Sequence, residues 1–416
     1  MIYENLYNMN ILIINQPQFN RGDESAHKGF VRALLSRMPE ASIKVLYRSY
    51  EIESIRQYRV MDSRVEYIVE PSQQMLFYKF LNQGLRKNRT WLWRFHPTFL
   101  RYKSIFMWAD WVVCAPGGIC MGGFQDWWHL FFLKLAKFFR RPLAYYGRSF
   151  GPFPVETESN RKFKDLSLEM LNYFSFLSIR DRKTELLADE LGLPYVSTVD
   201  SAFLDDAAVE IPYELKYEIG EKAYMVFVPN YLLWHYVYKG RIPHETVLAF
   251  YGRVIDEVWK SNPKLNIVML PQLFCGREYA LNDVELFRDL GKMKNDSRLI
   301  VVADCYSSDV QQSIIRNAKY VIGARYHSIV FAINQGVPCI ALSYEHKIAG
   351  LLDTLQKADW CVDFVEALDS EENQAKCLQQ IRETIPLLSD SNDIRIKAKT
   401  IAGNCMDMFI KKLRNE

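Results

Sequence analysis

The chain has 416 residues, which is long for one hydrophobic core and typical of two domains. Hydrophobic residues make up 49% and charged residues 24% of the chain, a composition that excludes general disorder. The formal net charge of +3 gives no reason to expect a nucleic-acid partner.

The eight cysteines form no CxxC pair, and several of them lie in apolar runs. Such cysteines are typically small buried hydrophobic residues of a reducing compartment. The N-terminal residues lack the basic and then apolar pattern of a secretion signal. No run of about 18 apolar residues predicts a transmembrane helix. We therefore expect a cytoplasmic protein.

Short apolar, β-branched runs alternate with longer helix-like segments along the chain. Most of these runs are apolar on both faces, as in parallel strands that helices cover on each side. The alternation predicts an α/β protein with two doubly wound sheets. The expected strands are 10–15, 43–48, 65–69, 111–115, 142–146, 176–179 and 195–199, and then 224–228, 266–270, 298–302, 320–322 and 338–342.

An acidic stretch with a proline, at about 205–222, interrupts this alternation. We therefore expect an N-terminal α/β lobe over residues 1–205 and a C-terminal α/β lobe over 206–368. Residues 369–416 are expected to form C-terminal helices without strands. Ligands of such sheets bind beyond the carboxyl ends of the strands, so the residues that follow each strand are the candidate site residues.

Three motifs follow expected strands of the first lobe. The sequence NRGDE at 20–24 precedes a helix, which Asn20 or Asp23 caps, or it forms a polar loop beside a ligand. The glycine-rich PGGICMGG, with Gly117 and Gly118, matches neither GxGxxG nor a P-loop, so we expect a loop that lines a cleft. In YGRSFGPF the glycines and the proline either simply build a turn, or Arg148 reaches into the cleft.

The sequence SIRD at 178–181 places Arg180 at the carboxyl end of a strand. Asp181 is the expected N-cap of a helix over 182–191, and Gly192 is its expected stop. Arg180 either pairs with an acidic side chain or binds a phosphate or carboxylate through its guanidinium fork.

The most informative motif is GARYHS at 323–328, followed by SYEHK at 343–347. Arg325 and His327 stand between a strand end and a helix expected over 328–335. The next strand end supplies Ser343, Glu345 and Lys347. This density of polar groups beside two apolar strands predicts a functional site, although a structural histidine is the alternative.

The ordered set NRGDES, APGGICMGG, YGRSFGPF, SIRD, TVDSAF, GARYHSIVFAINQGVP and SYEHK resembles the polysaccharide pyruvyl transferases, from about residue 10 to 355. The resemblance implies a GT-B-like fold of two Rossmann-like lobes. It also implies a bacterial enzyme of capsular polysaccharide or exopolysaccharide biosynthesis. Such an enzyme forms a pyruvate ketal on a sugar with phosphoenolpyruvate as donor.

The resemblance also carries over to single residues. The family's Arg-x-His pair falls on Arg325 and His327, its Arg-Asp pair on Arg180 and Asp181, its Tyr-x-x-Lys on Tyr344 and Lys347, and its Gly-Asp on Gly22 and Asp23. The sequence departs from the family where Gln is frequent, at Arg148, where Leu is common, at Tyr326, and where Asp-Pro-x-Phe is replaced by residues 200–203.

Phosphoenolpyruvate carries a phosphate and a carboxylate, for which we expect Arg180, Arg325, Lys347 and Ser343 as ligands. His327 is the expected proton donor, and Asp23 or Glu345 the expected base. Gly22, Gly117, Gly118 and Arg148 are expected to form an acceptor-side loop. No cofactor is required, and the seven histidines have no metal-ligand spacing.

Two alternatives to this function stay open, namely a nucleotide-sugar-dependent GT-B glycosyltransferase and a non-catalytic assembly scaffold. The segments 86–96 and 127–141 mix cations with large aromatic residues. In one interpretation these segments belong to the hydrophobic core, and their cations, such as Lys134, Lys137 and Arg141, point outward to solvent. In the other they form a peripheral membrane contact. Such a contact suits a lipid-linked saccharide acceptor at the inner face of the plasma membrane.

Overall fold

The computed structural model describes residues 8–17, 20–47, 56, 58–69, 84–87, 89–95, 97–123, 125–206, 209–234, 239–274, 282–344, 346–364 and 366–415. Contacts divide the chain into two units. One unit covers residues 1–18, 26–205 and 401–416, and the other covers 19–25 and 206–400.

The first unit contains a seven-stranded parallel sheet with the order β3-β2-β1-β4-β5-β6-β7. From β1 the chain first adds β2 and β3 on one side of the strand, and then adds β4 to β7 on the other side. The strand order therefore reverses between β1 and β4. The strands are β1 (Met9–Gln16), β2 (Ala41–Tyr47), β3 (Val65–Val69), β4 (Trp111–Cys114), β5 (Leu143–Arg148), β6 (Phe176–Ile179) and β7 (Val196–Ser197).

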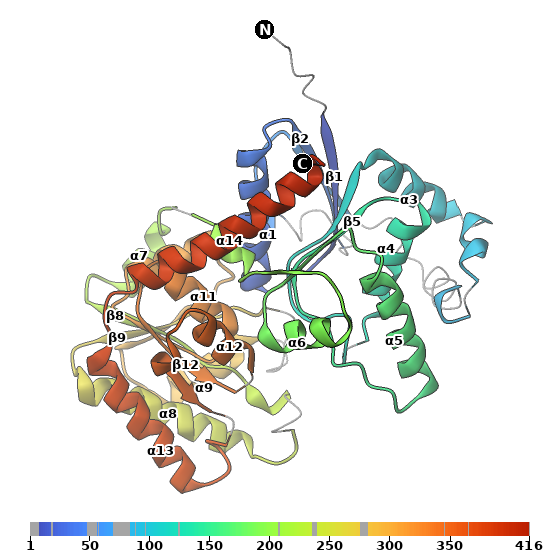
Figure 1. Ribbon diagram of the computed structural model, residues 1–416. Helices are drawn as coiled ribbons and strands as arrows, with labels where there is room; N and C mark the ends of the chain where they lie inside the picture. The colour runs from blue at the N-terminus through green and yellow to red at the C-terminus, as the bar shows by residue number, and fades with distance from the viewer. Residues whose placement is uncertain are drawn as a thin grey trace. The chain divides into compact units, whose positions relative to one another are not determined.

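Side chains on the two faces of this sheet enter two separate cores. On one face, Leu12 and Ile14 of β1 pack in a cluster with residues of α3, α4 and α5. On the other face, Ile11 and Ile13 pack with residues of α1 and of the C-terminal part of α14. Figure 1 shows where these two helices lie. The helices are α1 (Arg21–Arg37), α3 (Pro97–Trp108), α4 (Trp127–Phe138), α5 (Glu158–Leu171), α6 (Arg182–Glu190) and α14 (Asn392–Leu413), with 3-10 turns η2 (Thr90–Phe95) and η3 (Ser201–Leu204).

The second unit contains a six-stranded parallel sheet with the order β10-β9-β8-β11-β12-β13. Its strands are β8 (Tyr224–Val228), β9 (Asn266–Met269), β10 (Leu299–Val301), β11 (Val321–Gly323), β12 (Cys339–Ser343) and β13 (Cys361–Asp363). β13 was not among the expected strands, because it has only three residues and pairs along one side. The doubly wound architecture itself is confirmed.

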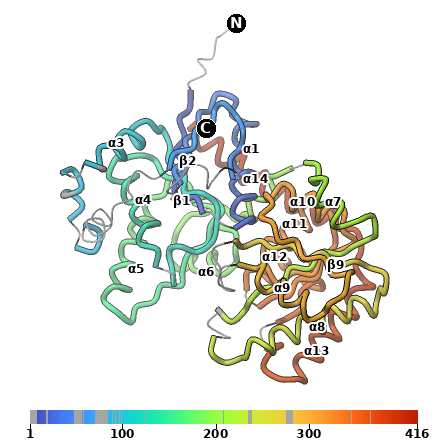
Figure 2. The backbone as a smooth tube through the Cα atoms, turned by 180° about the vertical axis from the view of Figure 1, so that it is seen from behind, coloured from blue at the N-terminus to red at the C-terminus, as the bar shows by residue number. Residues whose placement is uncertain are grey.

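Helices of the second unit pack in two groups, α8 with α9 and α13, and α10 with α11 and α12 (Figure 2). Right-handed crossovers between parallel strands give this division when the strand order reverses in the middle of a sheet. The helices are α7 (Tyr213–Ile219), α8 (His244–Ser261), α9 (Asp283–Lys294), α10 (Ser308–Arg316), α11 (Tyr326–Asn334), α12 (His346–Thr354) and α13 (Glu371–Thr384), with 3-10 turns η4 (Leu232–Trp234), η5 (Ala358–Trp360) and η6 (Ile385–Leu387).

Capping residues fix several helix ends where the sequence predicts them. Asp181 is the N-cap of α6, and its side chain accepts a hydrogen bond from the N–H of Thr184. Gly192 follows this helix with φ of +64°, a conformation that favours glycine. At α1 the cap is Asn20, whose Oδ1 accepts from the N–H of Gly22 at 2.8 Å.

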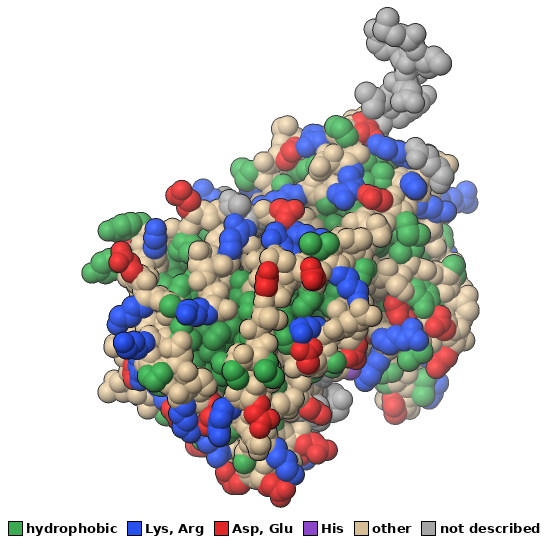
Figure 3. Space-filling model, turned by 60° about the vertical axis from the view of Figure 1, so that its left-hand side comes forward, with side chains coloured by type: hydrophobic (Ala, Val, Ile, Leu, Met, Phe, Trp, Pro, Cys, Tyr) green, Lys and Arg blue, Asp and Glu red, His purple; other side chains and the backbone are tan. Residues whose placement is uncertain are grey.

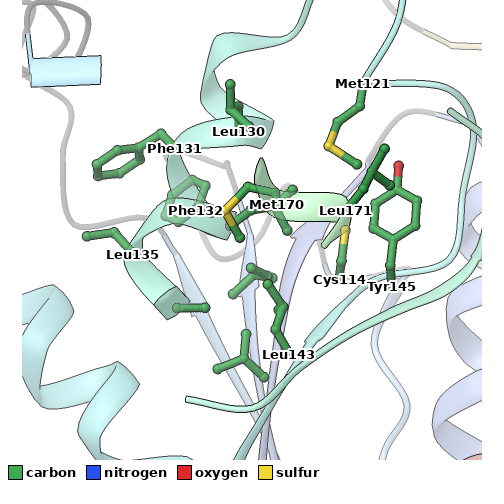
Figure 4. Packing of buried hydrophobic residues seen from close by; sticks show 14 of the residues in the cluster. Cys114, Met121, Leu130, Phe131, Phe132, Leu135, Leu143, Tyr145, Met170 and Leu171 are labelled. Atoms are coloured by element: carbon green, nitrogen blue, oxygen red, sulfur yellow. The ribbon is translucent and has the colours of Figure 1, made fainter. Parts of the chain in front are cut away.

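Helix α4 is a core helix of the first unit. Leu130, Phe131, Phe132 and Leu135 are buried, and Figure 4 shows them beside residues of α5 and of the sheet. Its cations Lys134 and Lys137 both pair with Glu169, at 2.7 and 2.8 Å. Burial acts to raise the pKa of Glu169, but the hydrogen bonds from the two lysines lower it below its usual value. Of the two interpretations of residues 127–141, helix α4 fits the one in which the segment belongs to the hydrophobic core.

Residues 369–416, which the sequence sets apart as helices, contain α13 and α14. Contacts place residues up to 400 in the second unit and 401–416 in the first. None of the described helices has the length and apolar character needed to cross a membrane. Basic and acidic side chains are interspersed over the face shown in Figure 3, in agreement with the small net charge.

The buried His27 predicts a pH dependence of stability. Its side chain is fully buried against the rings of Tyr47 and Tyr67, with Nε2 3.1 Å from the Tyr67 hydroxyl. Burial, with a smaller contribution from Lys28 and Arg32, lowers the pKa of His27 from 6.5 to about 3. The unfolded chain therefore binds a proton below pH 6.5, whereas the folded chain does not until about pH 3.

We expect the free energy of unfolding to fall by about 1 kcal/mol between pH 7 and 5.5 through this group. Denaturant unfolding at several pH values measures the change. The variant His27→Gln should be less stable at pH 7 and should lack this part of the pH dependence. The same pH dependence in the variant and the wild type would contradict the assignment.

Candidate functional site

In both sheets the strand order reverses once, between β1 and β4 in the first unit and between β8 and β11 in the second. The chain leaves the two strands in opposite directions at such a point, which opens a crevice at their carboxyl ends. Open α/β sheets bind ligands there. The residues that follow β4 and β11 are therefore the first candidates in each unit.

Arg325 and His327 lie at this reversal point of the second unit. β11 ends at Gly323, Arg325 is the N-cap residue of α11, and His327 lies in the first turn of the helix. The helix thus begins two residues before the expected 328–335. The Oγ of Ser328 donates to the carbonyl of Arg325 at 2.5 Å and fixes the backbone between strand and helix.

Arg325 forms a buried ion pair with Asp283, the first residue of α9. Asp283 is fully buried, and its second carboxylate oxygen accepts from the N–H groups of Gln272 and Leu273, each at 3.0 Å. Burial acts to lower the pKa of Arg325, but the charge of Asp283, the hydrogen bond to it and the nearby Tyr344 and Tyr251 together raise the pKa above its usual value. The Nε–H of Arg325 is buried without an acceptor among the described residues.

Asp283 was not predicted from the sequence as a residue of the candidate site. It follows Asn282, the N-cap of α9, and an acidic residue in a first helical turn is ordinary. Only the fold brings it to Arg325, 42 positions further along the chain. The spacing between the two residues carries no pattern that could have predicted the pair.

The NRGDE motif belongs to the second unit by its contacts. The N–H of Arg21 donates to the carbonyl of Gln272 at 2.9 Å, and Asn20 forms an antiparallel bridge with Leu273. Glu24 pairs with Arg21 at 2.5 Å and accepts from the N–H of Ser308, at the start of α10, at 3.0 Å. This differs from the expectation that Gly22 is part of an acceptor-side loop in the first lobe.

Gly22 is fixed against the imidazole of His327. A Cβ at position 22 would overlap the His327 ring, so glycine is the residue that permits this approach. His327 is 7% exposed, and its ring also packs edge-on against that of Tyr326 at 5.1 Å. The NRGDE motif is thus in direct contact with the Arg-x-His motif, which the sequence analysis did not predict.

The remaining predicted residues of the second unit lie near strand ends or helix starts. Asp23 is half-buried in the first turn of α1. Ser343 is the last residue of β12 and is 5% exposed, and Lys347 is half-buried in the first turn of α12. Tyr344 is buried close enough to Arg325 to affect its pKa. Glu345, the other expected base, lies outside the described residues.

In the first unit, Arg148 holds the glycine-rich loop. Its guanidinium is fully buried and donates to the carbonyl of Ala115 at 2.6 Å, and to the carbonyl of Gly118 and the sulfur of Cys120, each at 3.0 Å. Gly117 forms a parallel bridge with Arg148. Arg148 was expected to reach into a cleft, but these contacts direct it to the loop that follows β4.

Arg180 forms a buried ion pair with Asp200 in the first unit. The Arg180 side chain is 6% exposed, and the other Asp200 oxygen caps η3 through the N–H of Ala202 at 2.9 Å. Of the two interpretations of Arg180, pairing with an acidic side chain is the one observed. Within the described residues, no three or more His, Cys, Asp or Glu side chains gather as a metal site would require.

A known protein family matches most of this chain. The family model for polysaccharide pyruvyl transferase matches residues 20–346 of the chain. The match covers well over half of the 416 residues, from the NRGDE motif to the start of α12. The chain belongs to the polysaccharide pyruvyl transferase family.

Solved structures show the same two-lobed fold at low sequence identity. UDP-GlcNAc 2-epimerase from Neisseria meningitidis, bound to UDP-GlcNAc, matches with a TM-score of 0.61 and 10% identity, over 98% of this chain and 100% of that one. UDP-GlcNAc 2-epimerase from Methanocaldococcus jannaschii matches with a TM-score of 0.58 and 12% identity, over 98% and 100%. The fold is therefore of the GT-B type, with two Rossmann-like lobes.

The ion pair of Asp283 and Arg325 leads to a prediction about stability. The variant Asp283→Asn leaves the buried guanidinium without its countercharge, and we expect the free energy of unfolding to fall by about 3 kcal/mol. Denaturant unfolding measures it. The matched control is Asp296→Asn, which removes a carboxylate from a pair with Arg298 whose side chains are 28% and 30% exposed.

The control should change stability much less, because water screens a partly exposed pair. If both variants lost the same stability, the buried pair would have no special role. Retained stability in Asp283→Asn would contradict the prediction directly.

The close approach of Gly22 to His327 gives a second prediction. In Gly22→Ala the imidazole must move, and such overpacking typically lowers the free energy of unfolding by about 1–3 kcal/mol. The control is Gly350→Ala in α12, where a new Cβ meets no atom within 4 Å. Helix propensity predicts a neutral effect or a gain of up to about 1 kcal/mol there. Equal stability of Gly22→Ala and wild type would contradict the predicted overlap between a Cβ at position 22 and the His327 ring.

Proposed function

We propose that this member of the polysaccharide pyruvyl transferase family takes its pyruvyl group from phosphoenolpyruvate and forms a ketal with two hydroxyl groups of a sugar. The acceptor proposed is a surface polysaccharide unit or its lipid-linked precursor, in capsular polysaccharide or exopolysaccharide biosynthesis. The observation that carries the proposal is the buried Arg325, held by Asp283 beside His327 at the reversal point of the second sheet.

The chemistry of this set suits a small dianionic donor. A guanidinium binds carboxylate or phosphate through several N–H groups, and the Nε–H of Arg325 lacks an acceptor among the described residues. Ser343 is the last residue of the neighbouring strand β12, and Lys347 lies in the helix that follows it. Both are proposed to bind the rest of the phosphoenolpyruvate. Arg180 is left out of the donor site, because its guanidinium is engaged with Asp200.

In the proposed reaction, His327 protonates the methylene carbon of phosphoenolpyruvate, and C2 becomes electrophilic. One sugar hydroxyl adds to C2 and gives its proton to a base, for which Asp23 and Glu345 are proposed. The bond from C2 to the phosphate oxygen then breaks, and the second hydroxyl adds to C2. One of the two hydroxyl protons restores His327, and the other leaves with hydrogen phosphate.

The acceptor is proposed to bind at the corresponding edge of the first unit. Gly117 and Gly118 follow β4 at the reversal point of that sheet. Their backbone groups can approach a sugar closely, since no side chain intervenes. Arg148 supports this proposal indirectly, because it fixes the path of the loop from below the surface.

A nucleotide-sugar transferase is the second candidate, because the solved structures with this fold include an enzyme bound to UDP-GlcNAc. One experiment separates the two. The purified protein is incubated with saccharides that carry free hydroxyl pairs and with either phosphoenolpyruvate or a panel of nucleotide sugars. Mass spectrometry should then detect one pyruvyl ketal and release of phosphate, with phosphoenolpyruvate only.

Chelator treatment should leave this activity intact, since the proposed chemistry uses no metal ion. Glycosyl transfer from a nucleotide sugar, or a loss of activity that Mg²⁺ restores, would favour the second candidate. A non-catalytic scaffold predicts neither product, and predicts that His327→Ala leaves the polysaccharide of the cell unchanged.

Two variants divide the roles within the site. His327→Gln should lower kcat by about 10²-fold or more, with little change in the dissociation constant for phosphoenolpyruvate, because it removes the proton donor. Lys347→Ala should raise that dissociation constant by about tenfold or more, as expected for one lost hydrogen bond to a charged group. Wild-type kcat in His327→Gln would exclude His327 as the donor.

A further inference from the structure

Four large apolar side chains are exposed within a short part of the first unit. Trp91 and Phe95 of η2 are 57% and 76% exposed, and Leu100 and Met107 of α3 are 63% and 47% exposed. The rings of Trp91 and Phe95 pack edge-on at 6.2 Å. Isolated exposed apolar residues are normal in proteins, but a cluster of them marks a surface that another molecule covers. We call this cluster the η2–α3 surface.

Helix α3 does not need its outward apolar residues in order to fold. Phe99, Tyr102 and Phe106 anchor it in the core, where each is at most 5% exposed. Leu100 and Met107 lie seven positions apart, about two helical turns, and are therefore on a common face directed away from that core. Their exposure adds nothing to the packing of the first unit, so its explanation lies outside that unit's core.

The stretch of chain that carries the η2–α3 surface has charges of one sign. The sequence has no Asp or Glu between residues 71 and 109. The same stretch of chain contributes exposed basic side chains, namely Arg86, Lys87, Arg89, Arg94, Arg101 and Lys103. The whole chain, by contrast, has nearly balanced charges, with 52 basic and 49 acidic residues. The partner that fits this surface is therefore both apolar and anionic.

We propose that the η2–α3 surface binds an anionic phospholipid bilayer, with Trp91, Phe95, Leu100 and Met107 in the headgroup region and the basic side chains at the phosphates. Exposed aromatic and aliphatic residues among Lys and Arg have the composition of interfacial membrane contacts. Each Lys or Arg near such a surface strengthens binding by about fivefold. The binding requires no catalysis and stands independently of the proposed reaction.

The second unit offers a matched contrast. Tyr213 and Tyr217 of α7 are 77% and 81% exposed, more than any of the four apolar residues of the η2–α3 surface. Each is followed in the sequence by an acidic residue, Glu214 or Glu218. An anionic bilayer repels these carboxylates. Exposed aromatic rings alone therefore do not predict binding, and α7 supplies the control.

Flotation of the full chain with vesicles tests the proposal. Vesicles of phosphatidylcholine with 30% phosphatidylglycerol, about a typical anionic content, should bind the protein at low salt and release it as salt rises. Vesicles of phosphatidylcholine alone should bind much less. The triple variant Trp91→Ser, Phe95→Ser, Leu100→Ser should lose most of the binding, and Arg89→Ser with Arg101→Ser should weaken it about 25-fold.

The control Tyr213→Ser with Tyr217→Ser should bind as the wild type does. Circular dichroism and thermal unfolding verify that every variant is folded. The absence of binding at low salt, equal binding to both vesicle types, or an equal loss in the α7 control would overturn the proposal. Concentration-dependent dimerisation that the triple variant abolishes, without vesicle binding, would assign the surface to a second copy of the chain instead.

Discussion

The candidate site depends on the contacts that the buried carboxylate of Asp283 makes. One oxygen holds Arg325, and the other holds two backbone N–H groups of the loop after β9. That loop in turn accepts the N–H of Arg21, so the NRGDE motif is fixed beside α11. Gly22 then lies against His327. A single buried charge therefore connects three segments that are far apart in the sequence.

The sequence predicts the architecture well because parallel strands have a simple pattern. Strands covered by helices on both faces are apolar throughout. Helices of 9 to 18 residues separate most of them. The edge strand β13 was missed, since three residues carry too little pattern. The start of α11 was placed two residues late, because Tyr326 and His327 carry no capping pattern. Local sequence does not reveal such helix starts.

The site was predicted in part, and the missing parts share one physical cause. Arg325, His327 and Gly22 follow strands, where a motif can be recognised. Asp283 stands in an ordinary helix start, and its importance comes only from tertiary packing. The same packing directs Arg148 to the glycine-rich loop and Arg180 to Asp200. Sequence identifies a charged residue at a strand end, whereas its partner depends on the fold.

A buried ion pair is weak evidence for stability, because removal of two charges from water opposes most of their attraction. Apolar residues of similar volume often replace such pairs without loss. The pair of Asp283 and Arg325 therefore needs another explanation than folding. Asp283 keeps a guanidinium charged and oriented inside the protein, and leaves its Nε–H without an acceptor among the described residues. A hydrogen-bond donor prepared in this way suits an anionic ligand, which is the role proposed for Arg325, and in that proposal Asp283 positions the guanidinium.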